Sequence, residues 1–309
     1  KGMCLSFDTA PLPGWDGVDR VTPLLLRVSD NEIWLRGGHC WLRAMLSQWS
    51  GEERLHANVL TPVLISGKQG LSKSTFCRLL MPDSLRHYFV DNLNLAAGSS
   101  PEKKLVKNGL INLDEFDKIK ESQQATLKNL LQMVNVPVFR GKRLGWVNES
   151  RLASFIATTN VYQVLIDSTG SRRFLCVEVL KPISEEPLEH KQIYAQLKEE
   201  LKSGAPDYLN KEEEKALQKH NKAYYRQSLL EDVFHCCFRH PLETEKGIWL
   251  TTAEIFQVMR KFNSAALKEV SARQLGLKLS AMGYMAKHTS FGNRYYVFNL
   301  LAEKKEVSL

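Results

Sequence analysis

The central part of the chain alternates short apolar runs with stretches of helical spacing. The apolar runs predict five strands, at residues 63–65, 87–90, 107–113, 153–158 and 173–179. Between the third and fourth strands, residues 122–134 repeat apolar positions with the period of a helix. Strands with nearly continuous apolar runs that alternate with helices are typical of a parallel sheet covered on both faces. The pattern therefore predicts an α/β core whose functional residues lie at the carboxyl ends of the strands.

The chain before this core also has a helical period. Asn31 can cap a helix that places Trp41, Met45 and Trp49 on one face, and we expect a break in it at Gly37-Gly38. Residues 1–60 are therefore predicted to be an N-terminal helical segment packed against the core.

The chain after the core changes its pattern. Helices are expected at 190–202 and after Asn210, which can cap a helix with acids in its first turn. Beyond an expected boundary at 222, three helices are followed by two strands. The helices are predicted at 229–238, 252–262 and 271–282, a short strand at 248–250, and the last two strands at 284–287 and 294–298. The expected domains are the segment 1–60, an α/β core with lid helices at 61–222, and a winged-helix-like domain at 223–309.

The composition is that of a globular protein with an excess of positive charge. The chain has 309 residues, of which 43% are hydrophobic and 25% charged, and its net charge is +8. The pI of about 9.1 favours a polyanionic partner, nucleic acid first and an acidic membrane second. No apolar run approaches the ~20 residues that span a bilayer, so we expect a cytoplasmic protein without a membrane segment. Because the first residue is Lys, we also expect a longer natural protein.

The six cysteines form no C-x-x-C pair, so we expect reduced, buried thiols rather than a disulfide framework. His235, Cys236 and Cys237 cluster in sequence with His240, but the run lies in the helix predicted at 229–238, which has an apolar face. We interpret this cluster as core packing and predict no metal there.

Residues 63–75 read V-L-I-S-G-K-Q-G-L-S-K-S-T, which is an apolar strand, a glycine-bearing loop and a helix start. The glycines let backbone N–H groups turn toward phosphate oxygens, and the helix N-terminus adds its own donors. This is the layout of a P-loop, in which Lys73 reaches the β- and γ-phosphates and the Ser74 hydroxyl binds Mg²⁺. The expected nucleotide-binding residues are Gly67, Gln69, Gly70, Leu71, Ser72, Lys73, Ser74 and Thr75.

One position departs from the usual P-loop pattern. Ser72 stands where glycine normally precedes the lysine, and its Cβ crowds a backbone that packs against the nucleotide. This departure leaves the geometry of the loop, and with it ATP turnover, open.

Two further strands end in polar residues. The run L-I-N-L-D-E at 110–115 delivers two carboxylates, which is a Walker B motif in register after the P-loop. Asp114 is expected to hold Mg²⁺, directly or through water, and Glu115 to deprotonate the attacking water. The run S-F-I-A-T-T-N at 154–160 ends in Asn160, at the position of a γ-phosphate sensor.

Arg172 and Arg173 precede the last apolar strand of the core. A permanently charged guanidinium suits a developing phosphoryl charge, so either arginine is a candidate catalytic finger for a neighbouring subunit, or for its own. A pair of salt-bridging arginines is the alternative.

The run V-F-R-G-K-R-L-G-W-V at 138–147 predicts a β-hairpin with cations at its tip. Arg140, Lys142 and Arg143 are candidates to follow a DNA backbone, and Phe139 or Trp146 to stack on bases. An exposed basic hairpin without a partner is the alternative.

The C-terminal domain offers a second set of DNA candidates. Arg273 and Lys278 lie on the third predicted helix, and Lys287 and Arg294 on the predicted wing. A winged helix that mediates protein contacts is the alternative.

Taken together, the motifs resemble the virulence-associated protein E family, helicase-like P-loop proteins of phage and mobile elements. The matching pieces cover about the first two thirds of the chain and are W-D-G-V-D-R (15–20), G-K-Q-G-L-S-K-S-T-F (67–76), L-I-N-L-D-E-F-D (110–117), F-I-A-T-T-N (155–160) and T-G-S-R-R-F (169–174). The C-terminal third resembles the extension of Bacteroidetes-type members. The family is similar to superfamily 3 helicases, AAA+-like motors that commonly form hexameric rings.

The resemblance implies an α/β, AAA+-like P-loop NTPase core that acts on DNA. We therefore expect an ATPase with ATP and Mg²⁺ as cofactors, which translocates on or unwinds single-stranded or forked DNA in phage or mobile-element replication. A homo-oligomeric ring, such as a hexamer, is the expected assembly. Two alternatives stay open: a replication or regulatory module that binds ATP with little or no turnover, and an adaptor that recruits a replication protein through its winged helix.

Overall fold

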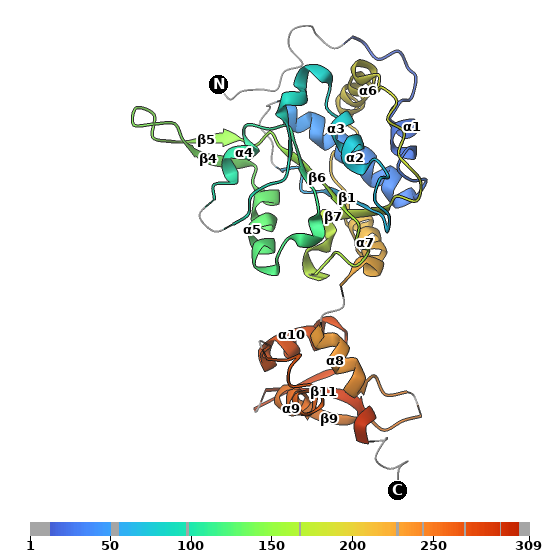
Figure 1. Ribbon diagram of the computed structural model, residues 1–309, viewed down its shortest axis with the longest axis vertical. Helices are drawn as coiled ribbons and strands as arrows, with labels where there is room; N and C mark the ends of the chain where they lie inside the picture. Colours follow the sequence, from blue (N-terminus) through green and yellow to red (C-terminus); the bar gives the residue numbers. More distant parts are fainter. Residues whose placement is uncertain are drawn as a thin grey trace. The chain divides into compact units, whose positions relative to one another are not determined.

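The chain forms two compact units. The computed structural model describes residues 13–50, 56–96, 99–166, 168–226, 229–242, 244–268, 270–290 and 292–302. Unit 1 is Lys1–Tyr225 and unit 2 is Arg226–Leu309 (Figure 1). Each unit has its own hydrophobic core, so each is described by itself.

Unit 1 is built around a five-stranded parallel sheet with the strand order β2-β3-β6-β1-β7. The strands are β1 (Thr61–Ile65), β2 (Phe89–Asp91), β3 (Leu110–Leu113), β6 (Ser154–Thr159) and β7 (Phe174–Glu178). Every residue of β1, β3 and β6 is buried, as expected for a sheet covered on both faces. The predicted α/β core with a parallel sheet is confirmed.

Two strand starts differ from the prediction. The second strand begins at Phe89 because Asp83–Tyr88 forms a 3-10 helix, η1. The third begins at Leu110, because the preceding residues turn after the short helix α4 (Glu102–Leu105).

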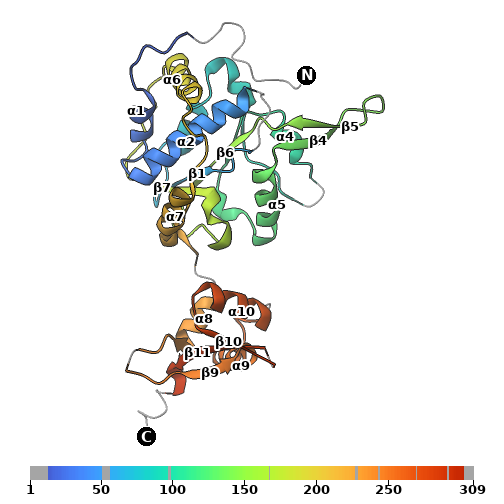
Figure 2. The same cartoon turned by 180° about the vertical axis from the view of Figure 1, so that it is seen from behind.

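Helices cover both faces of this sheet (Figure 2). One face packs against α1 (Val21–Leu26), α2 (Glu32–Trp49), α3 (Lys73–Leu79), α6 (His190–Lys202) and α7 (Lys211–His220). The other face packs against α5 (Glu121–Gln132) and the β4–β5 hairpin. Short 3-10 segments follow β3 (η2, Phe116–Lys118), precede β7 (η3, Ser168–Arg173) and follow α7 (η4, Asn221–Tyr224).

The expected break in α2 is wrong, because the helix is continuous through Gly37 and Gly38. A Cβ on Gly37 would lie 2.9 Å from Cδ2 of Leu175 in β7, and one on Gly38 would lie 2.8 Å from Cδ2 of Leu25 in α1. The two glycines therefore permit close packing of α2 on its neighbours, and this packing overrides their low helix propensity. Asn31 caps α2 as predicted, since its side chain accepts a hydrogen bond from a backbone N–H of the first turn.

The W-D-G-V-D-R stretch ties the beginning of the described chain to α6. Arg20 pairs with Asp16 through both terminal nitrogens, at 2.7 and 2.8 Å, and also with Glu189. Asp19 accepts a hydrogen bond from Gln196 Nε2 at 2.8 Å. The stretch that carries part of the family resemblance is therefore a structural clasp in this unit.

A β-hairpin projects from unit 1, as the pale green strands of Figures 1 and 2 show. Its strands β4 (Asn135–Phe139) and β5 (Trp146–Ser150) pair antiparallel, with Phe139 opposite Trp146. The predicted hairpin is confirmed, and its turn spans residues 140–145.

The described residues of unit 2 form the helices α8, α9 and α10 and a small antiparallel sheet. Its elements are α8 (Leu229–Cys237), β8 (Phe238–Arg239), β9 (Ile248–Thr251), α9 (Thr252–Phe262), α10 (Ala272–Ala281), β10 (Ala286–Thr289) and β11 (Gly292–Asn299). β11 pairs with β8, β9 and β10, and its residues Tyr295 and Val297 join the helices in one core. The predicted elements follow one another in the expected order, with β8 as an addition.

The histidine and cysteine cluster of α8 is only partly in the core. Cys237 is buried, but His235 and Cys236 are exposed, so core packing does not explain the whole cluster. Within the described residues, no group of three or more histidine, cysteine or acidic side chains could hold a metal ion. None of the described helices combines the length and the apolar character needed to cross a membrane.

Candidate active site

A pocket of about 390 Å³ lies at the carboxyl ends of β1, β3 and β6. Its lining comprises Gln69, Gly70, Leu71, Ser72, Lys73, Ser74, Thr75, Asp114, Glu115, Asp117, Thr158, Thr159, Asn160 and Val161. Three segments that are distant in sequence thus meet at one edge of the parallel sheet, where α/β folds place their ligands. Most of the predicted nucleotide residues line this pocket, together with Asp114, Glu115 and Asn160.

The loop between β1 and α3 has left-handed backbone at a glycine and at the serine before Lys73. Gly70 has φ of 76°, and Ser72 has φ of 59° and ψ of 24°, which is the left-handed conformation. This conformation costs an L-residue about 1–2 kcal/mol, whereas glycine adopts it freely. Ser72 is therefore a source of backbone strain in a loop that retains the turn expected of glycine.

Lys73 is the charge at the centre of the pocket. Its side chain is buried, with 8% of the residue exposed, and Nζ donates to Asn160 Oδ1 at 2.8 Å and to the Ser66 hydroxyl. Burial lowers the pKa of Lys73, while the nearby Asp114 carboxylate opposes this effect. A buried ammonium whose two hydrogen-bond partners are neutral fits an anionic ligand in the pocket.

Ser74 and Asp114, two side chains whose oxygens could ligate a metal ion, lie close together in the same pocket as this lysine. The Ser74 hydroxyl lies 3.4 Å from Oδ1 of Asp114, and the Thr158 hydroxyl also donates to that atom. The register Leu113↔Ala157 explains the second contact, because it sets the residues that follow side by side. Carboxylate and hydroxyl oxygens are the ligands that Mg²⁺ prefers, so this donor set fits the expected metal.

Asp117 and Thr159 are pocket residues that our sequence reasoning missed. The Thr159 hydroxyl donates to Asp117 Oδ1 at 2.6 Å, and it accepts from the backbone N–H of Val161 at 3.1 Å. The second aspartate of D-E-F-D and the two threonines before Asn160 were the available signals, but only the pairing of β3 with β6 brings them together.

Glu115, the predicted general base, lines the pocket in a strained conformation. Its φ is 52°, again in the left-handed region. Its carboxylate accepts a hydrogen bond from Lys118 Nζ at 2.6 Å, and both side chains are exposed. In this structure the candidate base is therefore held by a cation of its own loop.

The structure does not bring Arg172 or Arg173 into the pocket lining. The next residue, Phe174, pairs with Thr61 at the start of β1, whereas the P-loop follows the other end of that strand. Arg172 instead contacts Glu214 of α7 at 3.4 Å. The two arginines thus lie at the amino-terminal edge of the sheet, opposite the pocket at the carboxyl ends of the strands.

The β4–β5 hairpin presents both charge and aromatic surface. Phe139 and Trp146 are 49% and 72% exposed, and their ring centroids lie 5.6 Å apart. Lys142 and Arg143 are exposed in the turn, but Arg140 is bonded to Glu149, with one contact of 2.6 Å. Two of the three predicted cations are thus displayed, while the third is engaged by its own hairpin.

The four cations predicted in unit 2 differ in their surroundings. Lys278 Nζ contacts Glu231 Oε1 of α8 at 2.7 Å, so its charge is engaged inside the unit. Lys287 Nζ lies 4.4 Å from the ring centroid of Trp249. Arg273 and Arg294 are exposed on α10 and β11.

No curated protein matches the chain, whereas solved structures and family models do. Among solved structures, an apo structure of the NrS-1 C-terminal region is 14% identical and has a TM-score of 0.46, over 94% of this chain and 79% of that one. Another apo structure of that region is 17% identical, with a TM-score of 0.43 over 90% and 67%.

Two family models divide the chain at the boundary between its units. Residues 227–297 match a domain of unknown function from a B. theta gene description (DUF3874). Residues 11–226 match the virulence-associated protein E-like domain, which is more than half of the chain. The chain therefore belongs to the virulence-associated protein E-like domain family.

Proposed function

We propose that the protein is a Mg²⁺-dependent ATPase that translocates on or unwinds DNA in the replication of a mobile element. The observation that carries the proposal is the convergence of Lys73, Asn160, Ser74 and Asp114 on one pocket. It combines a buried cation for phosphate with an oxygen set for the metal.

Each pocket residue then has a role. Lys73 and the P-loop backbone bind the phosphates, and Asn160 orients the lysine and senses the terminal phosphate. Ser74 and Asp114 hold Mg²⁺, which supplies charge stabilisation to the transferring phosphoryl group. Thr158 fixes Asp114 through its hydroxyl, and Glu115 takes the proton of the attacking water.

An arginine from a neighbouring copy completes this site in the proposal. Arg172 and Arg173 lie at the edge of the sheet opposite their own pocket, which suits action on another subunit's nucleotide. Lys142, Arg143 and the Phe139–Trp146 pair of the hairpin contact DNA. A homo-oligomeric ring is the assembly in which both features are used.

The proposal is tested by ATP hydrolysis measured with and without single-stranded DNA. Lys73→Ala and Glu115→Gln are each expected to lower the DNA-stimulated rate of hydrolysis by about 100-fold or more. The first variant removes the cation that binds the phosphates, and the second removes the general base. Lys68→Ala is the matched control, since Lys68 is an exposed lysine of the same loop that does not line the pocket. Unchanged hydrolysis in both site variants would reject the assignment of this pocket.

A nucleotide-binding module with little turnover is the second candidate. The contact between Glu115 and Lys118 favours it, because the candidate base is bonded to a cation of its own loop and must leave that contact before it can reach a water in the pocket. Nucleotide binding without hydrolysis, in the presence of single-stranded, forked or duplex DNA, would support this candidate, and DNA-stimulated turnover would exclude it.

A further inference from the structure

The sheet of unit 2 carries aromatic side chains on the face that points away from its helices. In β11, Tyr295 and Val297 are buried in the core with the helices. Because side chains alternate along a strand, Tyr296 and Phe298 lie on the opposite face. The register pairs Tyr296 with Trp249 of β9, and their ring centroids lie 5.1 Å apart. All three aromatic residues of this face are partly exposed.

Two cations lie on the same face. Lys287 of β10 and Arg294 of β11 are exposed and directly opposite each other, and Lys287 reaches over Trp249. Like charges directly opposite each other destabilise a sheet. Trp249 and Glu254 each lie near one of these cations, and an anion laid across the strands would relieve the remaining repulsion between them.

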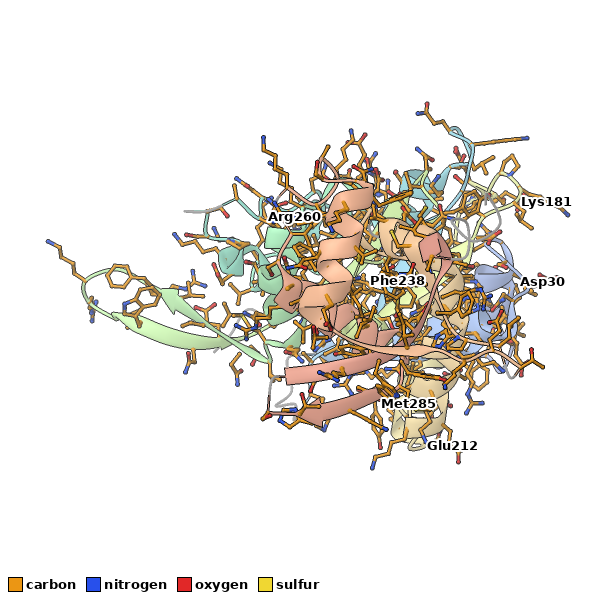
Figure 3. All side chains as sticks on the ribbon, turned by 90° about the horizontal axis from the view of Figure 1, so that it is seen from below. Asp30, Lys181, Glu212, Phe238, Arg260 and Met285 are labelled. Atoms are coloured by element: carbon orange, nitrogen blue, oxygen red, sulfur yellow. The ribbon has the colours of Figure 1, made fainter. Side chains whose placement is uncertain are left out.

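Arg239 and Glu254, two other charged residues near this face, are engaged within unit 2. The Arg239 guanidinium carbon lies 4.2 Å from the ring centroid of Phe298, and its nitrogens bond to Glu245. Glu254, which feels the charge of Arg294, has its carboxylate committed to the N-terminal cap of α9. Figure 3 shows the strands beside Met285 and the helix α9 that carries Arg260.

The exposed side of α10 is less suited to a nucleic acid. Of its two cations, Lys278 is bonded to Glu231. Leu277, one residue earlier, is 68% exposed, and it offers neither a charge nor a base-reading group. Cations and aromatic rings are thus combined on the sheet and not on the helix.

We propose that this aromatic sheet face (Trp249, Tyr296, Lys287 and Arg294) binds single-stranded nucleic acid. Unpaired bases stack on the rings, and the two cations contact the phosphates between them. A duplex is excluded as the preferred ligand, because its bases are stacked on one another and cannot offer their faces to a flat sheet. The inference goes beyond the proposed ATPase, and the binding does not depend on ATP in the pocket of unit 1.

The test measures binding of fluorescein-labelled oligo(dT) and oligo(U) to the full chain by anisotropy, without ATP. Trp249→Ala is expected to weaken binding about tenfold, since one stacking partner is lost. Lys287→Ala is expected to weaken it and to reduce the slope of log affinity against log salt by about one contact. Tyr208→Ala and Lys261→Ala are the controls, because they remove an exposed aromatic ring of unit 1 and an exposed cation of α9.

Two further measurements separate lost contacts from lost folding. Trp249→Phe keeps a ring and is expected to recover most of the affinity. Photocrosslinking with 5-bromouridine or 5-bromodeoxyuridine oligonucleotides in the unmodified chain is expected to label Trp249 or Tyr296. A higher affinity for oligo(U) would assign RNA as the natural strand, and equal or higher affinity for oligo(dT) would assign DNA.

The proposal is overturned if Trp249→Ala and Lys287→Ala leave both affinities unchanged, or if crosslinks fall only in the hairpin or in α10. Tighter binding of duplex DNA that is lost in Arg273→Ala would also overturn it, in favour of α10. Because the assay contains no ATP, an inactive pocket would not affect its outcome.

Discussion

Replacing Ser72 by glycine removes a side chain that strains the loop between β1 and α3. The left-handed backbone at φ 59° costs serine about 1–2 kcal/mol. Glycine loses about 0.5–1 kcal/mol more conformational entropy on folding. The difference predicts that Ser72→Gly stabilises unit 1 by about 0.5–1 kcal/mol. For a unit of this size, that gain raises the midpoint of unfolding by about 1–4 °C.

Scanning calorimetry of the full chain is the appropriate assay, because two units need not unfold in one transition. Ser72→Ala is the matched control, since it keeps the Cβ and removes only a hydroxyl that does not cap α3. We expect alanine to stay within about 0.5 kcal/mol of the natural protein. A destabilised glycine variant, or an alanine variant as stable as the glycine one, would refute the strain explanation.

Three further predictions concern other contacts. Gly37→Ala should lower the free energy of unfolding of unit 1 by about 1–3 kcal/mol in urea, because the added Cβ overlaps Leu175 of β7. This effect should outweigh the better helix propensity of alanine, and a stabilised variant would contradict it. Glu149→Gln should free the Arg140 guanidinium to contact DNA. Anisotropy titrations should then show tighter binding of single-stranded DNA and a steeper dependence of the affinity on salt. An unchanged affinity would show that Arg140 is not a DNA contact. Hydrogen bonds from Arg239 hold the pKa of Glu245 at about 2, so unit 2 should lose stability as pH falls from about 4.5 to about 2. In Glu245→Gln, the midpoint of thermal unfolding should fall less over this pH range. A pH profile that matches the unchanged protein would contradict the prediction.

Local patterns were sufficient to predict much of the core. The strands β1, β3 and β6 are mostly apolar and buried along their whole length, and each leads into a polar residue of the site. Because parallel strands end at a common edge, Lys73, Asp114 and Asn160 could be placed together from the sequence. Asp117 could not, because its partner Thr159 is set by the pairing between strands.

Tertiary contacts explain the remaining differences. Gly37 and Gly38 indicated a helix break, but α2 is continuous there, and the two glycines allow it to pack closely on β7 and α1. Lys278 had the spacing of a DNA contact, but its partner Glu231 lies on a different helix. Sequence spacing predicts which residues share a face, and it does not predict which charges are already paired.

The position of β6 has a consequence for how the protein acquires its site. This strand lies between β1 and β3 in space but follows both in sequence. It supplies Asn160 to the lysine of the P-loop and Thr158 to the aspartate after β3. During synthesis, a chain that already contains Lys73 and Asp114 therefore lacks a formed pocket until β6 pairs between β1 and β3. Site assembly is thus a late, non-local folding step, and pairings of this kind form slowly.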